Sequence, residues 1–66
     1  MTLTVNNKAT EAKEGCNVEE LASQLALPAQ GVAIAVNNRM IPRPQWAGCV
    51  LKENDSVVII KAACGG

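Results

Sequence analysis

The chain has 66 residues, so we expect one domain, near the size at which folding buries only about 60% of the surface that the unfolded chain exposes. Apolar residues make up 48% of it, but Trp46 is the one aromatic residue, which predicts a core of aliphatic side chains. The formal net charge is zero and there is no histidine, so no excess of charge would attract the chain to nucleic acid or to an anionic membrane.

The cysteines and the N-terminal residues indicate a cellular compartment. Cys16, Cys49 and Cys64 cannot all pair within one chain, and their spacing contains no CxxC pair of the kind that holds zinc or an iron–sulfur cluster. The start, MTLTVNNK, lacks the basic residues and long apolar stretch of a signal peptide, and the run VAIAV is too short to span a bilayer. We therefore expect a soluble, cytoplasmic chain with reduced thiols and no metal.

The first predicted element is a β-hairpin over residues 2–12. In TLTV, Leu3 and Val5 share one face of a strand and the two threonines share the other. NNK then forms a turn, and ATEA continues as a weaker, more polar strand.

A helix follows the hairpin. Asn17 can cap its first turn, and Glu20, three positions later, can reach back to form a capping box. Because proline disfavours helical geometry at the preceding residue, Pro28 predicts an end near Leu27. The apolar positions at helical spacing are Val18, Leu21, Ala22 and Leu25.

Strands are predicted for most of the rest of the chain. VAIAV is a strand, NNRMIPRPQW holds a turn and a short strand around Met40 and Ile41, and two prolines exclude a long regular element after it. GCVL predicts another short strand. SVVIIK, apolar on both faces, predicts a last strand in the middle of its sheet.

This order predicts an α+β, ubiquitin-like β-grasp fold, with a mixed sheet of four to five strands wrapped on one helix. The domain would comprise residues 1–62, followed by a flexible tail over residues 63–66. No GxxxxGK[ST] phosphate loop, GxGxxG motif or catalytic histidine is present, so we do not expect an enzyme.

Successive side chains of the last strand must point to opposite faces. We assign Val57 and Ile59 to the core, which places Val58 and Ile60 on the open face of the sheet. The expected neighbours are Leu3, Val5 and Ile34 in the core and Ala33 and Ala35 on the open face. Either this exposed apolar face binds a partner, or loops cover it.

The chain ends on KAACGG, and the two glycines suit a carboxylate that an enzyme activates. To form an acyl-adenylate, such an enzyme must bring the chain end through a narrow passage to ATP. Gly65 and Gly66 have no Cβ atom and are the thinnest residues for that passage. Alternatively, the glycines belong to an ordinary chain terminus and have no role.

Over its whole length the sequence resembles the ThiS family of bacterial sulfur carriers of thiamine biosynthesis. The resemblance rests on the length, on the ending Gly65 and Gly66, and on AVNNRMIPRPQW with Asn37, Pro42, Arg43 and Trp46. It implies that a ThiF-like adenylyltransferase adenylates Gly66, with ATP and magnesium bound by that partner and no cofactor on this chain. A sulfur-relay protein would then leave a thiocarboxylate, and the thiazole synthase ThiG would receive the sulfur.

Several residues of this pattern have two interpretations. We expect Trp46 to close one end of the core rather than to bind a partner. Arg43, held in extended geometry between two prolines, would bind a partner carboxylate or make a local ion pair. Cys64, where the family more usually has a small apolar residue, either traps the activated acyl group with its thiol or, as we expect, is an inert residue of the tail that the partner contacts. Cys16 and Cys49 are expected to be small, partly buried residues.

Three other functions stay open at this point. The closest is the small subunit of molybdopterin synthase, which shares the tail chemistry. A ubiquitin-like modifier attached to lysines is the second. The third is a binding module of the same fold whose terminal glycines have no role.

Overall fold

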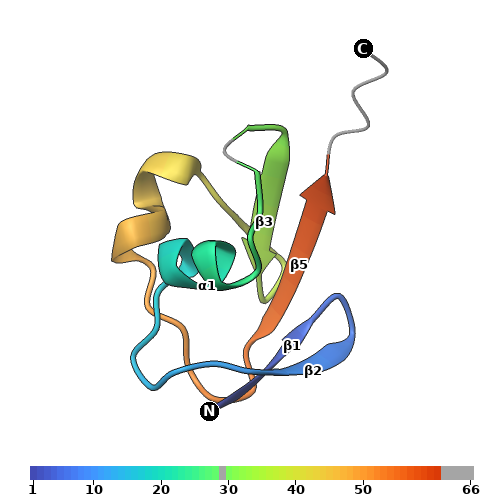
Figure 1. The fold of residues 1–66 in the computed structure, drawn as a ribbon, viewed down its shortest axis with the longest axis vertical. Helices are drawn as coiled ribbons and strands as arrows, with labels where there is room; N and C mark the ends of the chain where they lie inside the picture. The colour runs from blue at the N-terminus through green and yellow to red at the C-terminus, as the bar shows by residue number, and fades with distance from the viewer. Residues whose placement is uncertain (29, 62–66) are drawn as a thin grey trace.

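A computed structural model describes residues 1–28 and 30–61 and shows one helix packed on a mixed sheet of five strands (Figure 1). The predicted α+β arrangement is therefore confirmed. The elements are β1 (Thr2–Val5), β2 (Lys8–Glu11), α1 (Val18–Gln24), β3 (Val32–Val36), β4 (Arg39–Ile41), a 3₁₀ helix η1 (Arg43–Gly48) and β5 (Ser56–Lys61).

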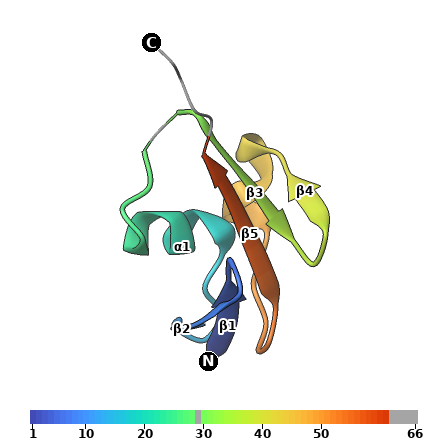
Figure 2. The ribbon, with the colours of Figure 1, turned by 90° about the vertical axis from the view of Figure 1, so that its right-hand side faces the viewer.

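The last strand lies at the centre of the sheet, as its apolar sequence predicted. The strand order is β2-β1-β5-β3-β4, with β5 parallel to β1 and antiparallel to β3. Figure 2 shows β5 between β3 and the β1–β2 hairpin, with α1 to one side. The hairpin pairs Thr2 with Glu11 and Val5 with Lys8, in agreement with the predicted span.

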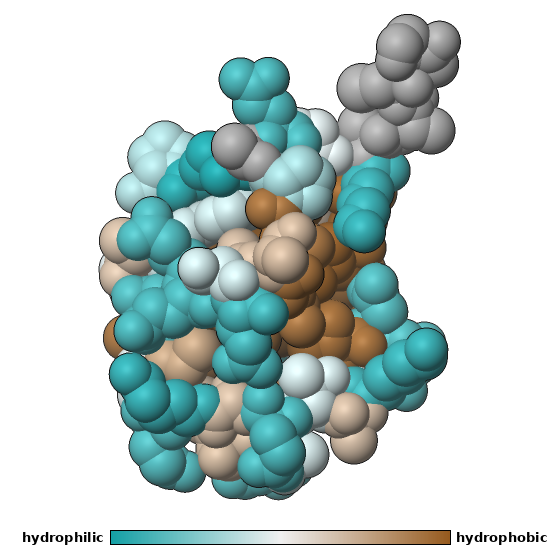
Figure 3. All heavy atoms as spheres, viewed as in Figure 1, coloured by the Kyte–Doolittle hydropathy of each residue, from teal (hydrophilic) through white to brown (hydrophobic). Residues whose placement is uncertain are grey.

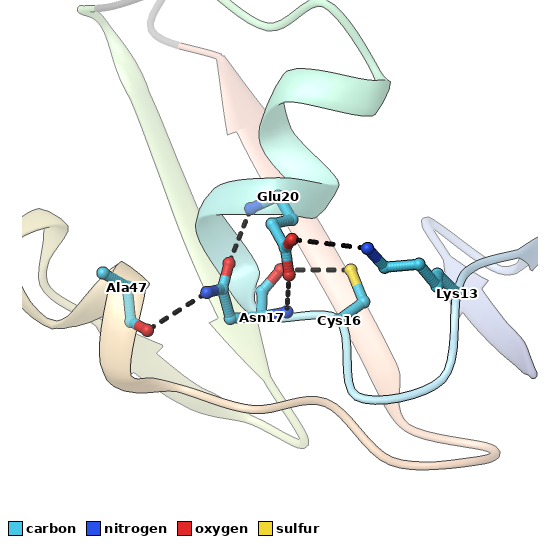
Figure 4. Close-up of polar contacts among 5 residues, drawn as sticks. All are labelled: Lys13, Cys16, Asn17, Glu20 and Ala47. Carbon is cyan, nitrogen blue, oxygen red and sulfur yellow. Dashed lines mark hydrogen bonds and ion pairs between the residues drawn. The ribbon is translucent and has the colours of Figure 1, made fainter.

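The start of α1 is the predicted capping box (Figure 4). Asn17 Oδ1 accepts a hydrogen bond from the Glu20 amide at 2.7 Å, and the Glu20 carboxylate accepts one from the Asn17 amide at 3.1 Å. The Asn17 side-chain amide also donates to the carbonyl of Ala47 at 3.1 Å. One side chain thus caps α1 and attaches η1 to it.

The helix ends earlier than predicted. It stops at Gln24 rather than near Leu27, because Ala26 adopts a left-handed backbone with φ 56°. The amides of Ala26 and Leu27 turn back to the carbonyls of Ser23 and Ala22, each at 3.0 Å, which satisfies carbonyls of the last turn. The stop therefore precedes Pro28 and occurs at a residue type that rarely takes this conformation.

The segment after β4 differs from the prediction in two ways. Instead of extended chain, Arg43 begins η1, so its predicted geometry was wrong. Pro44 is accommodated because the first turn of a helix does not need its amide hydrogen. The strand predicted in GCVL was also wrong: in the described residues Val50 makes only an isolated bridge, to Asn17.

The core is aliphatic, as the composition predicted. Trp46 is 3% exposed and donates its ring Nε1–H to the carbonyl of Ile41 at 2.8 Å, so it closes the core as expected. Each large aliphatic side chain contributes about 1.5–3 kcal/mol on full burial. The largest fully buried residues are Leu3, Val18, Leu21, Ile34 and Val57.

Candidate functional site

Apolar side chains remain exposed on the face of the sheet opposite α1. Val58 is 39% exposed and Ile60 is 52% exposed, and they pair with Ala35 and Ala33 of β3. Met40 of β4 lies across from Ala35 and is 57% exposed. We call these five residues the open-face patch: Ala33, Ala35, Met40, Val58 and Ile60.

The composition of the open-face patch explains its shape. The two alanines of β3 keep the middle of the patch low, while the longer side chains of β4 and β5, the neighbours of β3, project on either side. Figure 3, in the view of Figure 1, has α1 on the near side and shows apolar atoms along β5 with hydrophilic atoms above and below them. The open-face patch lies on the other face of the sheet, where Met40, Val58 and Ile60 are exposed. Exposed apolar area of this kind is typical of a surface that binds a partner.

The positions of Val58 and Ile60 agree with the prediction, and their exposure excludes a covering loop within the described residues. Met40 was not predicted to belong to this surface. Its place follows from strand pairing, because the residue opposite Ala35 must share its face. The sequence signal was the two-residue turn at Asn37 and Asn38, which sets the register of β4.

Arg43 stacks on Trp46. Its guanidinium carbon lies 4.1 Å from the centre of the ring, which is a cation–π contact. Residues three apart lie above one another in a 3₁₀ helix, and this geometry of η1 brings the two side chains together. The Arg43 side chain is exposed, so its N–H groups can also reach a carboxylate on another molecule.

The ion pairs of residues 1–28 and 30–61 join the N-terminal ammonium to Glu14 and Lys13 to Glu20. Arg43 makes none of these pairs. Of the two interpretations of Arg43, the local ion pair is thus not observed in the described residues.

Cys16 is not suited to nucleophilic chemistry. Its side chain is 2% exposed and donates its S–H to the carbonyl of Asn17 at 3.2 Å (Figure 4). Burial raises the pKa of the Cys16 thiol above its ordinary value of 9.0, Glu20 raises this pKa further, and Lys13 opposes them. Cys49 is half-buried, as predicted, whereas Cys16 is fully buried, and both thiols are free within the described residues.

Two further features of the described residues bear on function. Residues 1–28 and 30–61 contain no group of three or more His, Cys, Asp and Glu side chains that could hold a metal ion. Over the same residues, no helix has the length and apolar character needed to cross a membrane.

The predicted tail follows directly from β5. Lys61 is the last residue of this strand, and residues 62–66 come after it. Cys64, Gly65 and Gly66 lie outside the described residues, so their predicted roles stay predictions.

The comparisons with known proteins cover the whole chain. The model of the ThiS family matches residues 1–66. The sulfur carrier protein ThiS of Escherichia coli (strain K12) is 32% identical over 66 residues, which is all of both chains.

Solved structures agree with this match. A crystal structure of the thiamine biosynthesis protein ThiS from Geobacter metallireducens superimposes with a TM-score of 0.87 at 32% identity, covering 100% of both chains. A solution structure of a thiamine biosynthesis protein from the same organism gives 0.83 at 30% identity, covering 100% of this chain and 88% of that one. The fold prediction and the resemblance are both confirmed, and the chain belongs to the ThiS family.

Proposed function

We propose that this chain carries sulfur for thiamine biosynthesis as a thiocarboxylate on Gly66. The observation that carries the proposal is the match to the ThiS family over residues 1–66, which includes the terminal glycines. The chain is then a protein cosubstrate that partner enzymes modify, rather than an enzyme.

The chemistry needs two steps at the terminal carboxylate. In the active site of a ThiF-like adenylyltransferase, a carboxylate oxygen of Gly66 attacks the α-phosphorus of ATP, with magnesium bound there, and pyrophosphate leaves. The outer sulfur of a persulfide on a sulfur-relay protein then attacks the acyl carbon, AMP leaves, and the chain is joined to the relay through an acyl disulfide. A second thiol attacks the relay sulfur of that disulfide, which releases the thiocarboxylate and leaves a disulfide between that thiol and the relay. The thiocarboxylate sulfur is a good nucleophile, and the thiazole synthase ThiG would receive this sulfur.

The domain and the tail have different tasks in this proposal. Residues 1–62 form the part that partners recognise, and residues 63–66 form the part that enters their active sites. Gly65 leaves room next to the reacting group because it has no Cβ atom. Cys64 enters with the tail and contacts the partner, but its thiol takes no part in the reaction.

We assign partner recognition to the open-face patch and Arg43. Val58 and Ile60 offer exposed apolar area next to the start of the tail, which suits an apolar surface on the adenylating enzyme. Arg43, already held by Trp46, loses little side-chain freedom when it binds a partner carboxylate.

We place the chain in the cytoplasm, which the free thiols of Cys16 and Cys49 support.

The test is ATP–pyrophosphate exchange by a ThiF-like enzyme. Exchange of labelled pyrophosphate into ATP should depend on this chain and should be lost when Gly65 and Gly66 are removed. No exchange, with an enzyme that is active on its own carrier, would contradict the proposal. Exchange only with the adenylating enzyme of molybdopterin synthesis would favour that pathway. Stable conjugates to lysines in cells would favour a modifier, and unchanged partner binding without the glycines would favour a plain binding module.

A further inference from the structure

The side chain of Asn6 completes the edge of β5. Asn6 Oδ1 accepts a hydrogen bond from the amide of Ile59 at 2.8 Å, and Asn6 Nδ2 donates to the carbonyl of the same residue at 3.4 Å. The backbone amide of Asn6 donates to the carbonyl of Val57 at 2.9 Å. The asparagine therefore pairs with Ile59 as a residue of a neighbouring strand would.

This contact begins where the strand pairing ends. β1 pairs with β5 at Thr4–Ser56 and Val5–Val57, and then the chain turns away into β2. Beyond Val57 no strand of the described residues lies on this side of β5. Ile59 would otherwise present an open edge, and open edges fray or pair with other chains.

The other hairpin provides a matched site. Asn37 is also the first residue of a two-residue turn, with φ 51° against 50° for Asn6. Its side chain accepts from the amide of Ser56 and donates to Asp55, each at 3.0 Å. Asn37 thus holds the beginning of β5, whereas Asn6 holds the part that leads to the tail.

We propose that Asn6 is a positioning residue for the reacting chain end. By pairing with Ile59 it keeps the last residues of β5, which lead to the tail, in the sheet. An adenylating enzyme then has fewer residues to order when it binds the chain. This inference rests on the proposed function, because it assigns Asn6 a part in presenting Gly66.

The first test compares Asn6→Gly with Asn37→Gly by amide hydrogen exchange of the free protein. Glycine tolerates the left-handed backbone of both turns, so each change removes side-chain hydrogen bonds with little added strain. In Asn6→Gly the Ile59 amide should exchange at least about tenfold faster, beyond any change in global stability. In Asn37→Gly the Ser56 amide should respond instead. Equal protection of Ile59 in both variants would overturn the inference.

The second test measures adenylation of the same variants. Asn6→Gly should raise KM at least about five-fold with little change in kcat, because more of the chain must be ordered on binding. Asn37→Gly should leave KM close to that of the unchanged chain. If Asn6 only stabilises the fold, Asn6→Gly should also leave KM unchanged. A similar KM in both variants would overturn the role of Asn6, whereas failure of the unchanged chain to be adenylated would contradict the proposed function itself.

Discussion

The two faces of β5 are built from the same residue types but have different environments. Val57 is 0% exposed beneath α1, and its neighbour Val58 is 39% exposed on the opposite face. A strand that is apolar on both faces usually has a covering layer on each side. In the described residues α1 covers one face, whereas Val58 and Ile60 on the other face stay exposed.

The largest effect should come from a charge on the covered face. Val57→Asp would bury an unpaired carboxylate among Leu3 and Ile34, and we expect it to lower the free energy of unfolding by at least about 3 kcal/mol. Urea denaturation followed by circular dichroism measures this loss. A variant as stable as the unchanged chain would show that this face is not the core.

The same charge one residue later should change binding instead of stability. Val58→Asp should alter the free energy of unfolding by no more than about 0.5 kcal/mol, as for other surface positions. Adenylation by a ThiF-like enzyme should fall at least about tenfold, because the carboxylate would be buried against an apolar partner surface. Severe unfolding of this variant would place Val58 in the core and remove the distinction between the faces.

A smaller effect is expected at the edge of the core, where Arg43 stacks on Trp46. Arg43→Gln should lower the free energy of unfolding by about 0.5–1 kcal/mol, the usual contribution of an exposed cation–π contact. Thermal denaturation measures it, with Arg39→Gln as the control for loss of a surface charge. Equal loss in both variants would mean that the stacked contact does not stabilise the fold.

The smallest effect concerns the pH dependence of stability at Cys16. Burial raises the pKa of this thiol above 9.0 in the folded chain, so folding disfavours the thiolate. The contribution of Cys16 to the free energy of unfolding is therefore fully present below pH 9. It is lost as the pH rises from the pKa of the thiol in the unfolded chain toward the higher pKa in the folded chain. The free energy of unfolding should fall more steeply above pH 9 in the unchanged chain than in Cys16→Ala. Parallel curves would contradict this assignment.

Features that depend on neighbouring residues were predictable from the sequence. Asn17 and Glu20 are three residues apart, so the capping box and the start of α1 could be read directly. Alternation in β5 was sufficient to separate Val57 from Val58. The central position of β5 was predicted for the same reason, because its sequence is apolar on both faces.

Features that depend on distant or unusual residues were not predictable. Asn6 and Ile59 are 53 positions apart, and an asparagine in a turn carries no sign of a distant partner. Ala26 ends α1 in a left-handed conformation that would have been predicted at a glycine. The 3₁₀ helix was missed because its prolines suggested extended chain, although the first turn of a helix accepts proline.

The most direct test is the accurate mass of the C-terminal fragment released after Lys61, from chain incubated with a ThiF-like enzyme, ATP and a cysteine-derived sulfur source. Accurate mass is needed because replacing oxygen by sulfur has nearly the same nominal mass change as oxidation, and Cys64 lies in this fragment. The expected result is a sulfur-for-oxygen change located on Gly66. An unmodified Gly66, with an enzyme that modifies its own carrier in parallel, would contradict it.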